Sequence, residues 1–157
     1  MIIVSNTSPI NYLILIGHIN LLPELFGAII IPQAVYSELS DASAPSPFQT
    51  WIATPPNWLK IQPVSQSSDA ILDLLDPGER EAILLAQEIN ANLLLLDDMK
   101  ARRTASERGF PITGILGILD QAATIKLIDL PAAVQNLQSA SFWASDSLFQ
   151  TVYFKSC

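Results

Sequence analysis

Three polar residues stand directly after two short apolar runs of this chain. Residues 2–5 are followed by Asn6, and residues 93–96 are followed by Asp97 and Asp98. Short apolar runs next to helical patterns are typical of strands buried on both faces of a parallel sheet. In such sheets ligands bind in the crevice beyond the carboxyl ends of the strands. We therefore expect Asn6, Asp97 and Asp98 to lie where an open α/β protein keeps its chemistry.

Two glutamates on expected helices are candidates for the same crevice. Glu79 shares a helix face with Ala82 and Ile83, so it is expected on the buried side of its helix. Glu81 shares another face of that helix with Glu88, and this face is expected to be exposed to solvent. Glu38 leans toward the core side of an earlier helix. Carboxylate oxygens are the ligands that Mg²⁺ and Mn²⁺ prefer, so this set of residues favours a metal site.

Each candidate also has a purely structural interpretation, and the sequence alone leaves both open. Asp98 could cap the helix that follows it, and Asp76 with Glu79 could form a capping box. Asn6 or one of the next two residues could cap the first helix. Glu38 could be a surface glutamate at the end of a helix. Capping and metal binding can also coexist in one residue.

Basic residues follow the Asp97–Asp98 pair directly. Lys100, Arg102 and Arg103 could form an ordinary solvated helix face, with Asp98 pairing to Arg102 at i,i+4. Alternatively, the two arginines could hold a phosphate next to the metal site.

The composition excludes several other chemistries. His18 is the only histidine and Cys157 the only cysteine, so neither a zinc site nor a serine-based triad is expected. No glycine-rich phosphate-binding motif follows either main strand, which counts against a nucleotide cofactor. The net charge of −7 is expected to repel phosphate backbones over most of the surface. A single cysteine permits no internal disulfide, and we expect a cytoplasmic protein.

The elements that would position these residues alternate between strands and helices. We predict strands at 2–5, 28–31, 93–96 and 111–113, and helices at 9–17, 19–26, from 32, 76–90, 99–108, 114–126 and after 131. This alternation is the pattern of a parallel sheet covered on both faces. No run approaches the roughly 18 apolar residues of a membrane helix, and we interpret the N-terminus as mature structure.

The length of 157 residues favours one domain with two unusual segments. Residues 40–63 are rich in proline and contain Trp51 and Trp58, which predicts a loop-rich insertion with one or two helical turns. Residues 141–157 are rich in aromatic side chains. We expect this C-terminal segment to pack on the domain body or on a second subunit.

Five stretches of the chain are informative when taken together: residues 4–9, 31–39, 76–83, 94–98 with Arg102 and Arg103, and 113–117. In this order they resemble the PIN-domain superfamily of small metal-dependent nucleases. The match is closer to a prokaryotic PIN-like subfamily with Ser-Asn-Thr-Ser-Pro at the first strand end. The resemblance implies a three-layer α/β/α sandwich around a parallel sheet of four or five strands. Strands one and four would be neighbours, which brings Asn6 and Asp97 together, with Glu38 and Glu79 closing the pocket.

The resemblance also implies an activity. In this superfamily three or four acids hold one or two Mg²⁺ or Mn²⁺ ions that activate water for phosphodiester cleavage. By analogy, Glu79, Asp97 and Asp98 would bind metal, and Glu38 would bind it or orient water. Arg102 or Arg103 would steady a substrate phosphate. Many relatives are toxins that cut RNA until a small antitoxin protein blocks them, and homodimers are common among them.

Asn6 departs from the usual pattern, in which the first acid is an aspartate. The pocket then has one negative charge fewer, although the remaining carboxylates suffice for one Mg²⁺. Two hypotheses follow. The chain is a metal-dependent ribonuclease acting on single-stranded RNA, with Asn6 completing the catalytic pocket, or it is a weakly active or inactive PIN-like module that binds protein or nucleic acid without cutting.

Overall fold

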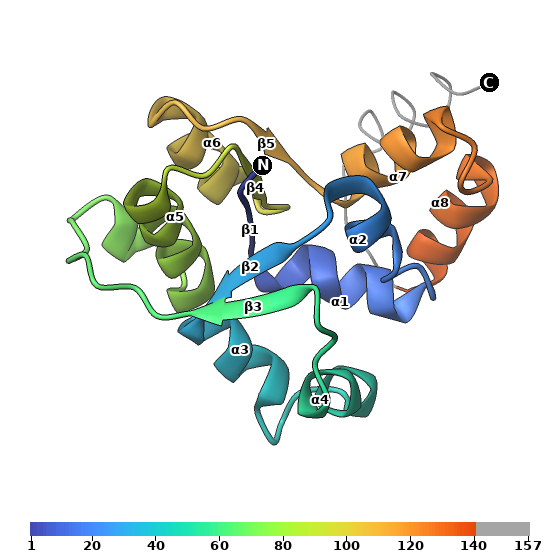
Figure 1. Cartoon of the computed structure of the whole chain (residues 1–157), viewed down its shortest axis with the longest axis horizontal. Coiled ribbons are helices and arrows are strands. Elements are labelled where there is room, and N and C mark those ends of the chain that lie inside the picture. The colour runs from blue at the N-terminus through green and yellow to red at the C-terminus, as the bar shows by residue number, and fades with distance from the viewer. Residues whose placement is uncertain (141–157) are drawn as a thin grey trace.

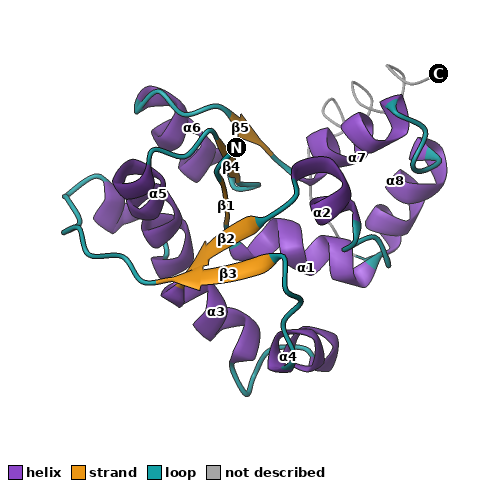
Figure 2. Ribbon diagram, in the orientation of Figure 1, coloured by secondary structure: helices purple, strands orange, loops and turns teal. Residues whose placement is uncertain are grey.

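The computed structural model describes residues 1–140, and its centre is a sheet of five parallel strands (Figure 2). The strands are β1 (Ile3–Ser5), β2 (Ile29–Pro32), β3 (Leu59–Gln62), β4 (Leu93–Leu95) and β5 (Ile112–Thr113), in the spatial order β3-β2-β1-β4-β5. The chain first builds the sheet outward from β1 through β2 to β3. It then returns to add β4 on the other side of β1. The change of direction between β1 and β4 is where an open α/β sheet forms its ligand crevice.

The pairing of β1 with β4 aligns the two strand ends that the sequence singled out. Val4 lies opposite Leu94 and Ser5 opposite Leu95. The ladder extends one residue further, because the backbone N–H of Asn6 donates to the carbonyl of Leu95 over 3.0 Å. The expected neighbourhood of strands one and four is therefore confirmed.

Helices cover both faces of the sheet, which makes the predicted three-layer α/β architecture. They are α1 (Thr7–Leu15), α2 (Leu21–Phe26), α3 (Gln33–Ser40), α4 (Ser46–Ala53), α5 (Pro77–Ile89), α6 (Met99–Glu107), α7 (Ile115–Thr124) and α8 (Leu130–Ser139). Figure 1 shows α5 and α6 on one side of β1 and β4, and α1, α7 and α8 on the other. The buried residues of α5 and α6 form one hydrophobic cluster, and those of the remaining helices form a second.

Successive strand residues point into these two clusters alternately. Ile3 packs in the cluster of α1 and α7, whereas Val4 packs in the cluster of α5 and α6. In β4, Leu95 and Leu94 divide in the same way. Since successive side chains of a strand point to opposite faces, a strand covered on both sides must be apolar throughout. This is why the two strands appear in the sequence as unbroken apolar runs.

The segment 40–63 is more ordered than expected. It contains the two-turn helix α4, as predicted, but also β3, which the sequence analysis missed. β3 is an edge strand in which only Leu59 is buried, so its hydrophobic pattern is weak. Trp51 of α4 lies against Trp58, with ring centroids 5.8 Å apart, and this contact joins α4 to the start of β3.

Most other differences from the prediction are shifts of one or two residues at element ends. Pro32 is the last residue of β2 and precedes α3, rather than opening that helix. The first helix begins at Thr7 instead of Pro9. The aromatic segment 141–157 lies outside the described residues, so its packing stays a prediction. Among residues 1–140, none of the helices has the length and apolar character needed to cross a membrane.

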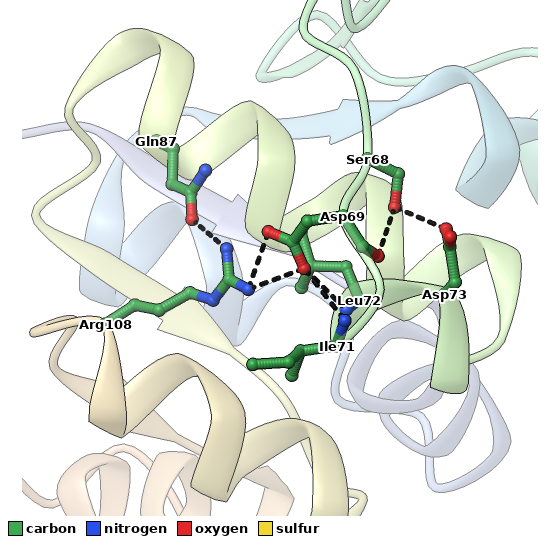
Figure 3. A network of polar contacts seen from close by, with 7 residues as sticks. All are labelled: Ser68, Asp69, Ile71, Leu72, Asp73, Gln87 and Arg108. Carbon is green, nitrogen blue, oxygen red and sulfur yellow. Dashed lines mark hydrogen bonds and ion pairs between the residues drawn. The ribbon is translucent and has the colours of Figure 1, made fainter.

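The long connection from β3 to α5 is held by Arg108, which follows α6 (Figure 3). Its Nη2 pairs with Asp69 at 2.9 Å, and its Nη1 donates to Oε1 of Gln87 over 2.7 Å. Asp69 Oδ1 in turn accepts the backbone N–H groups of Ile71 and Leu72, each over 3.0 Å. These contacts order the turn that leads into α5. Arg108 thus joins the end of α6 to the connection that precedes α5.

Candidate functional site

Asn6 stands at the carboxyl end of β1 with its side-chain oxygen unsatisfied. It occupies the N-cap position of α1, with φ −81° and ψ 176°, but its side chain makes no capping hydrogen bond. The residue is 3% exposed, and within the described part of the chain its Oδ1 is buried without a hydrogen-bond partner. A buried polar atom without a partner is costly. The capping interpretation of Asn6 therefore does not account for its side chain.

Glu38 reaches the same point from α3. Its Oε1 accepts the backbone N–H of Gly78 over 3.1 Å, and its Oε2 accepts the hydroxyl of Thr7. Burial raises the pKa of Glu38 above its ordinary value, although the bonds from Thr7 and Gly78 act in the opposite direction. A Cβ at position 78 would lie 2.6 Å from Glu38 Oε1 and 3.0 Å from Asn6 Oδ1. The glycine therefore leaves the space into which both oxygens project.

Glu79 forms the expected capping box at the start of α5. Its backbone N–H donates to Asp76 Oδ1 over 2.8 Å, and its Oε1 accepts the N–H of Asp76 over 3.2 Å. The side chain is nonetheless on the inward face, and the residue is 7% exposed. Burial, followed by the charge of Asp76 and more weakly that of Asp98, raises the pKa of Glu79 to about 7. The capping role is present, and the buried carboxyl also lies near enough to Asp98 for that charge to raise its pKa.

Asp97 lies beyond β4, beside the start of α7. Its Oδ1 accepts the backbone N–H of Ile115 over 2.8 Å, whereas its Oδ2 is buried without a hydrogen-bond partner in the described chain. A Cβ on Gly114 would stand 2.5 Å from Oδ1, so the glycine permits this approach. Burial raises the pKa of Asp97 to about 6, against the opposing effects of the Ile115 N–H and the charge of Arg102. Burial raises the pKa of Tyr12, and the charge of Asp97 adds to this effect.

Asp98 has the helix-capping role that the sequence left open. It is exposed and caps α6, accepting the backbone N–H of Ala101 over 3.1 Å. Asp98 and Arg102 do not form the suggested ion pair. The ion pair found in the described part of the chain joins Arg108 to Asp69. Arg102 Nη1 donates instead to the carbonyl of Leu96 over 3.3 Å.

A family model described as a PIN domain matches residues 2–156. The chain is a member of the PIN-domain family. No curated protein and no solved structure matches it. The family belongs to a superfamily of nucleases that generally use divalent metal ions, in agreement with the resemblance carried by the sequence motifs.

One prediction about this PIN domain is wrong: Glu81 does not face solvent. It is half-buried, and its Oε1 accepts the backbone N–H of Ala34 at the start of α3 over 3.0 Å. Glu88, also expected to be solvated, accepts the N–H of Ser65 over 3.1 Å. A signal for Glu81 was available, because α3 follows Pro32 and has no side-chain cap of its own. A helix start without a local cap needs an acceptor from elsewhere.

The residues at these strand ends are of types that suit a divalent cation. Within the described chain two buried oxygens, Asn6 Oδ1 and Asp97 Oδ2, have no hydrogen-bond partner, and burial raises the pKa of Glu38, Glu79 and Asp97. Amide and carboxylate oxygens are suitable ligands for Mg²⁺ or Mn²⁺. Among residues 1–140, no three His, Cys, Asp or Glu side chains lie together so that they could hold a metal ion. A metal site built from Glu38, Glu79, Asp97 and Asp98 would therefore use at most two of these carboxylates, and the amide oxygen of Asn6 is the further candidate ligand.

Proposed function

We propose that this PIN domain is a Mg²⁺- or Mn²⁺-dependent ribonuclease, the toxin of a toxin–antitoxin pair. The observation that supports the proposal most directly is the pair of unpartnered oxygens, Asn6 Oδ1 and Asp97 Oδ2, beyond two adjacent strand ends. Both atoms are buried, and they belong to residues that follow β1 and β4. These neighbouring strands are where the chain changes from adding strands on one side of the sheet to adding them on the other. In this proposal one hard cation binds both oxygens and offsets the charge of Asp97.

In this proposal Asp97 and Glu79 bind the metal, with Asn6 completing the pocket. The bound ion would supply an activated water and stabilise negative charge on the phosphate. Glu38 would bind the ion or orient water, and Thr7 and Gly78 hold its carboxylate in place. Asp98 would act through its charge, since its carboxylate caps α6.

The arginines differ in how available they are to a substrate. Arg102 donates to the carbonyl of Leu96, whereas Arg103 is exposed on α6. We therefore assign the contact with a substrate phosphate to Arg103 and the charge next to Asp97 to Arg102. The net charge of −7 disfavours broad contact with nucleic acid, so this basic helix would be where single-stranded RNA is bound.

The remaining expectations are parts of the same proposal. The chain would act in the cytoplasm as one domain, with a small antitoxin protein as its inhibitor. The aromatic segment 141–157 would pack on the domain body or on a second copy in a homodimer.

Asn6 favours a second candidate, a PIN module that binds protein or nucleic acid without cutting. An amide brings an oxygen but no charge to the position where an aspartate is usual. Such a pocket could keep a weak metal site without supporting hydrolysis.

A nuclease assay decides between the two candidates. Single-stranded RNA is incubated with the protein and Mg²⁺ or Mn²⁺, beside the Asp97→Asn variant and a chelator control. Metal-dependent cleavage that is lost in the variant supports the ribonuclease. Equal cleavage by both proteins would indicate contamination, and RNA binding without cleavage would favour the second candidate.

A further inference from the structure

Two glutamates connect α3 and α5 by bonding to each other's first turns. Glu81, in the second turn of α5, accepts the backbone N–H of Ala34 at the start of α3 over 3.0 Å. Glu38, in the second half of α3, accepts the backbone N–H of Gly78 at the start of α5 over 3.1 Å. Each helix thus provides a carboxylate for the N-terminus of the other. We call these two bonds the reciprocal cap.

The reciprocal cap has a clear physical basis. The first N–H groups of a helix have no partner within it, and the positive end of the helix dipole favours a carboxylate there. α3 begins after Pro32 without a side-chain cap, so Glu81 supplies what the local sequence lacks. A rotation or translation of α3 along α5 would break both bonds. The two helices are therefore fixed in one register.

We infer that Glu81 is a positioning residue of the candidate site: by anchoring the start of α3 on α5, it holds Glu38 beside Gly78 and Asn6. The structural part of this inference is independent of the chemistry. Its consequence for metal binding rests on the proposed function. Glu81 itself bonds to Ala34 and is not assigned a contact with metal or substrate.

Glu88 provides a matched control in the same helix. Like Glu81, it is a half-buried glutamate of α5 that accepts a backbone N–H from a distant segment, that of Ser65 over 3.1 Å. It lies about two helical turns further from the site and bonds to the connection after β3. Its removal deletes a comparable contact without affecting the reciprocal cap.

The test compares Glu81→Ala, Glu81→Gln and Glu88→Ala by NMR hydrogen exchange in the absence of metal. In Glu81→Ala the amide of Ala34 should exchange roughly tenfold faster, as expected for the loss of a helix cap. The amide of Gly78 should also exchange faster, because the displaced Glu38 no longer accepts from it. Glu81→Gln keeps an oxygen acceptor and should restore most of the protection at both amides, and Glu88→Ala should leave both amides as in the wild type.

Gly78 is the deciding amide, because a merely stabilising Glu81 would change Ala34 and leave Gly78 protected. Unchanged protection of Gly78 in Glu81→Ala would overturn the inference. If Glu81→Ala does not fold, Glu81→Asp replaces it with the same expectations, since its shorter side chain holds the carboxylate away from Ala34.

A Mn²⁺ titration of the same proteins distinguishes the positioning role of Glu81 from the existence of the proposed metal site. If the wild type binds Mn²⁺, Glu81→Ala should bind it at least several-fold more weakly and Glu88→Ala as the wild type does. Unchanged affinity in Glu81→Ala would contradict the inference while leaving the proposed metal site intact. If the wild type binds no Mn²⁺, the proposed function fails, and the exchange of Gly78 still decides the role of Glu81.

Discussion

Asp97→Asn should stabilise the metal-free protein at neutral pH while removing its metal site. The asparagine keeps an oxygen at the position of Oδ1, which accepts the N–H of Ile115. It replaces the unpartnered Oδ2 by an amide nitrogen and removes a charge that burial disfavours. A buried charge that is needed to bind a ligand lowers the stability of the ligand-free protein. Removing such a charge therefore raises stability and abolishes binding.

The magnitude follows from the pKa of Asp97. Burial raises this pKa from the ordinary 3.8 to about 6, so the folded protein holds the proton more tightly than the unfolded chain. The stabilisation that Asp97 contributes is therefore fully present below pH 3.8 and is lost as pH rises through 6. Each pKa unit corresponds to about 1.4 kcal/mol, so the ionised side chain costs up to about 3 kcal/mol at pH 7.5. The new amide N–H groups also need partners, which reduces the expected gain to about 1–3 kcal/mol.

Urea unfolding of both proteins with EDTA, at pH 4 and at pH 7.5, measures this effect. The difference between the variant and the wild type isolates Asp97, because the other groups titrate in both proteins. Between the two pH values the variant should gain about 2–2.5 kcal/mol on the wild type, because the cost of the new amide N–H groups is the same at both and cancels. At this chain length the gain corresponds to several degrees in Tm. With Mn²⁺ at pH 7.5, only the wild type should gain stability.

A difference between the two proteins that is the same at both pH values would refute this reasoning. It would mean that Asp97 ionises in the folded state as easily as in the unfolded chain. A gain in stability with Mn²⁺ that persists in Asp97→Asn would instead remove Asp97 from the metal site.

Three further predictions follow. Asn6→Asp should destabilise the metal-free protein, tighten Mn²⁺ binding in a titration and raise any nuclease activity; if Asn6 only caps α1, the exchange changes none of these quantities. Gly78→Ala should weaken Mn²⁺ binding about tenfold or more, because its Cβ would stand 2.6 Å from Glu38 Oε1; unchanged affinity would mean that Glu38 is not a ligand. Arg108→Ala should speed proteolysis of the connection between β3 and α5 without changing Mn²⁺ affinity; equal proteolysis in both proteins would show that the contacts with Asp69 and Gln87 do not order that segment.

Features set by neighbouring residues could be predicted from the sequence. The capping box of Asp76 and Glu79 depends on a four-residue pattern, and the structure contains both of its hydrogen bonds. The positions of Asn6 and Asp97 followed from where two apolar runs end. That these two strands are neighbours required the family resemblance, because periodicity along the chain carries no information on strand order.

Features set by distant segments left only indirect signals in the sequence. Glu81 and Glu88 appeared to be solvated because their partners, the N–H groups of Ala34 and Ser65, belong to other parts of the chain. β3 was missed because an edge strand with one buried side chain has almost no hydrophobic pattern. A helical face of glutamates indicates exposure only where no backbone donor packs against it.

The electrostatics of the pocket give a reason for an amide at position 6. Burial raises the pKa of Glu38, Glu79 and Asp97, so the metal-free fold already bears the cost of carboxylates that are difficult to ionise. An aspartate at position 6 would place a fourth charge beside Glu38, since both side chains border the space left by Gly78. Asparagine offers a ligand oxygen without that charge. On the proposed function, the amide would lower the metal affinity in favour of stability of the metal-free protein. Asn6→Asp should then have lower stability in EDTA and higher stability in Mn²⁺ than the wild type.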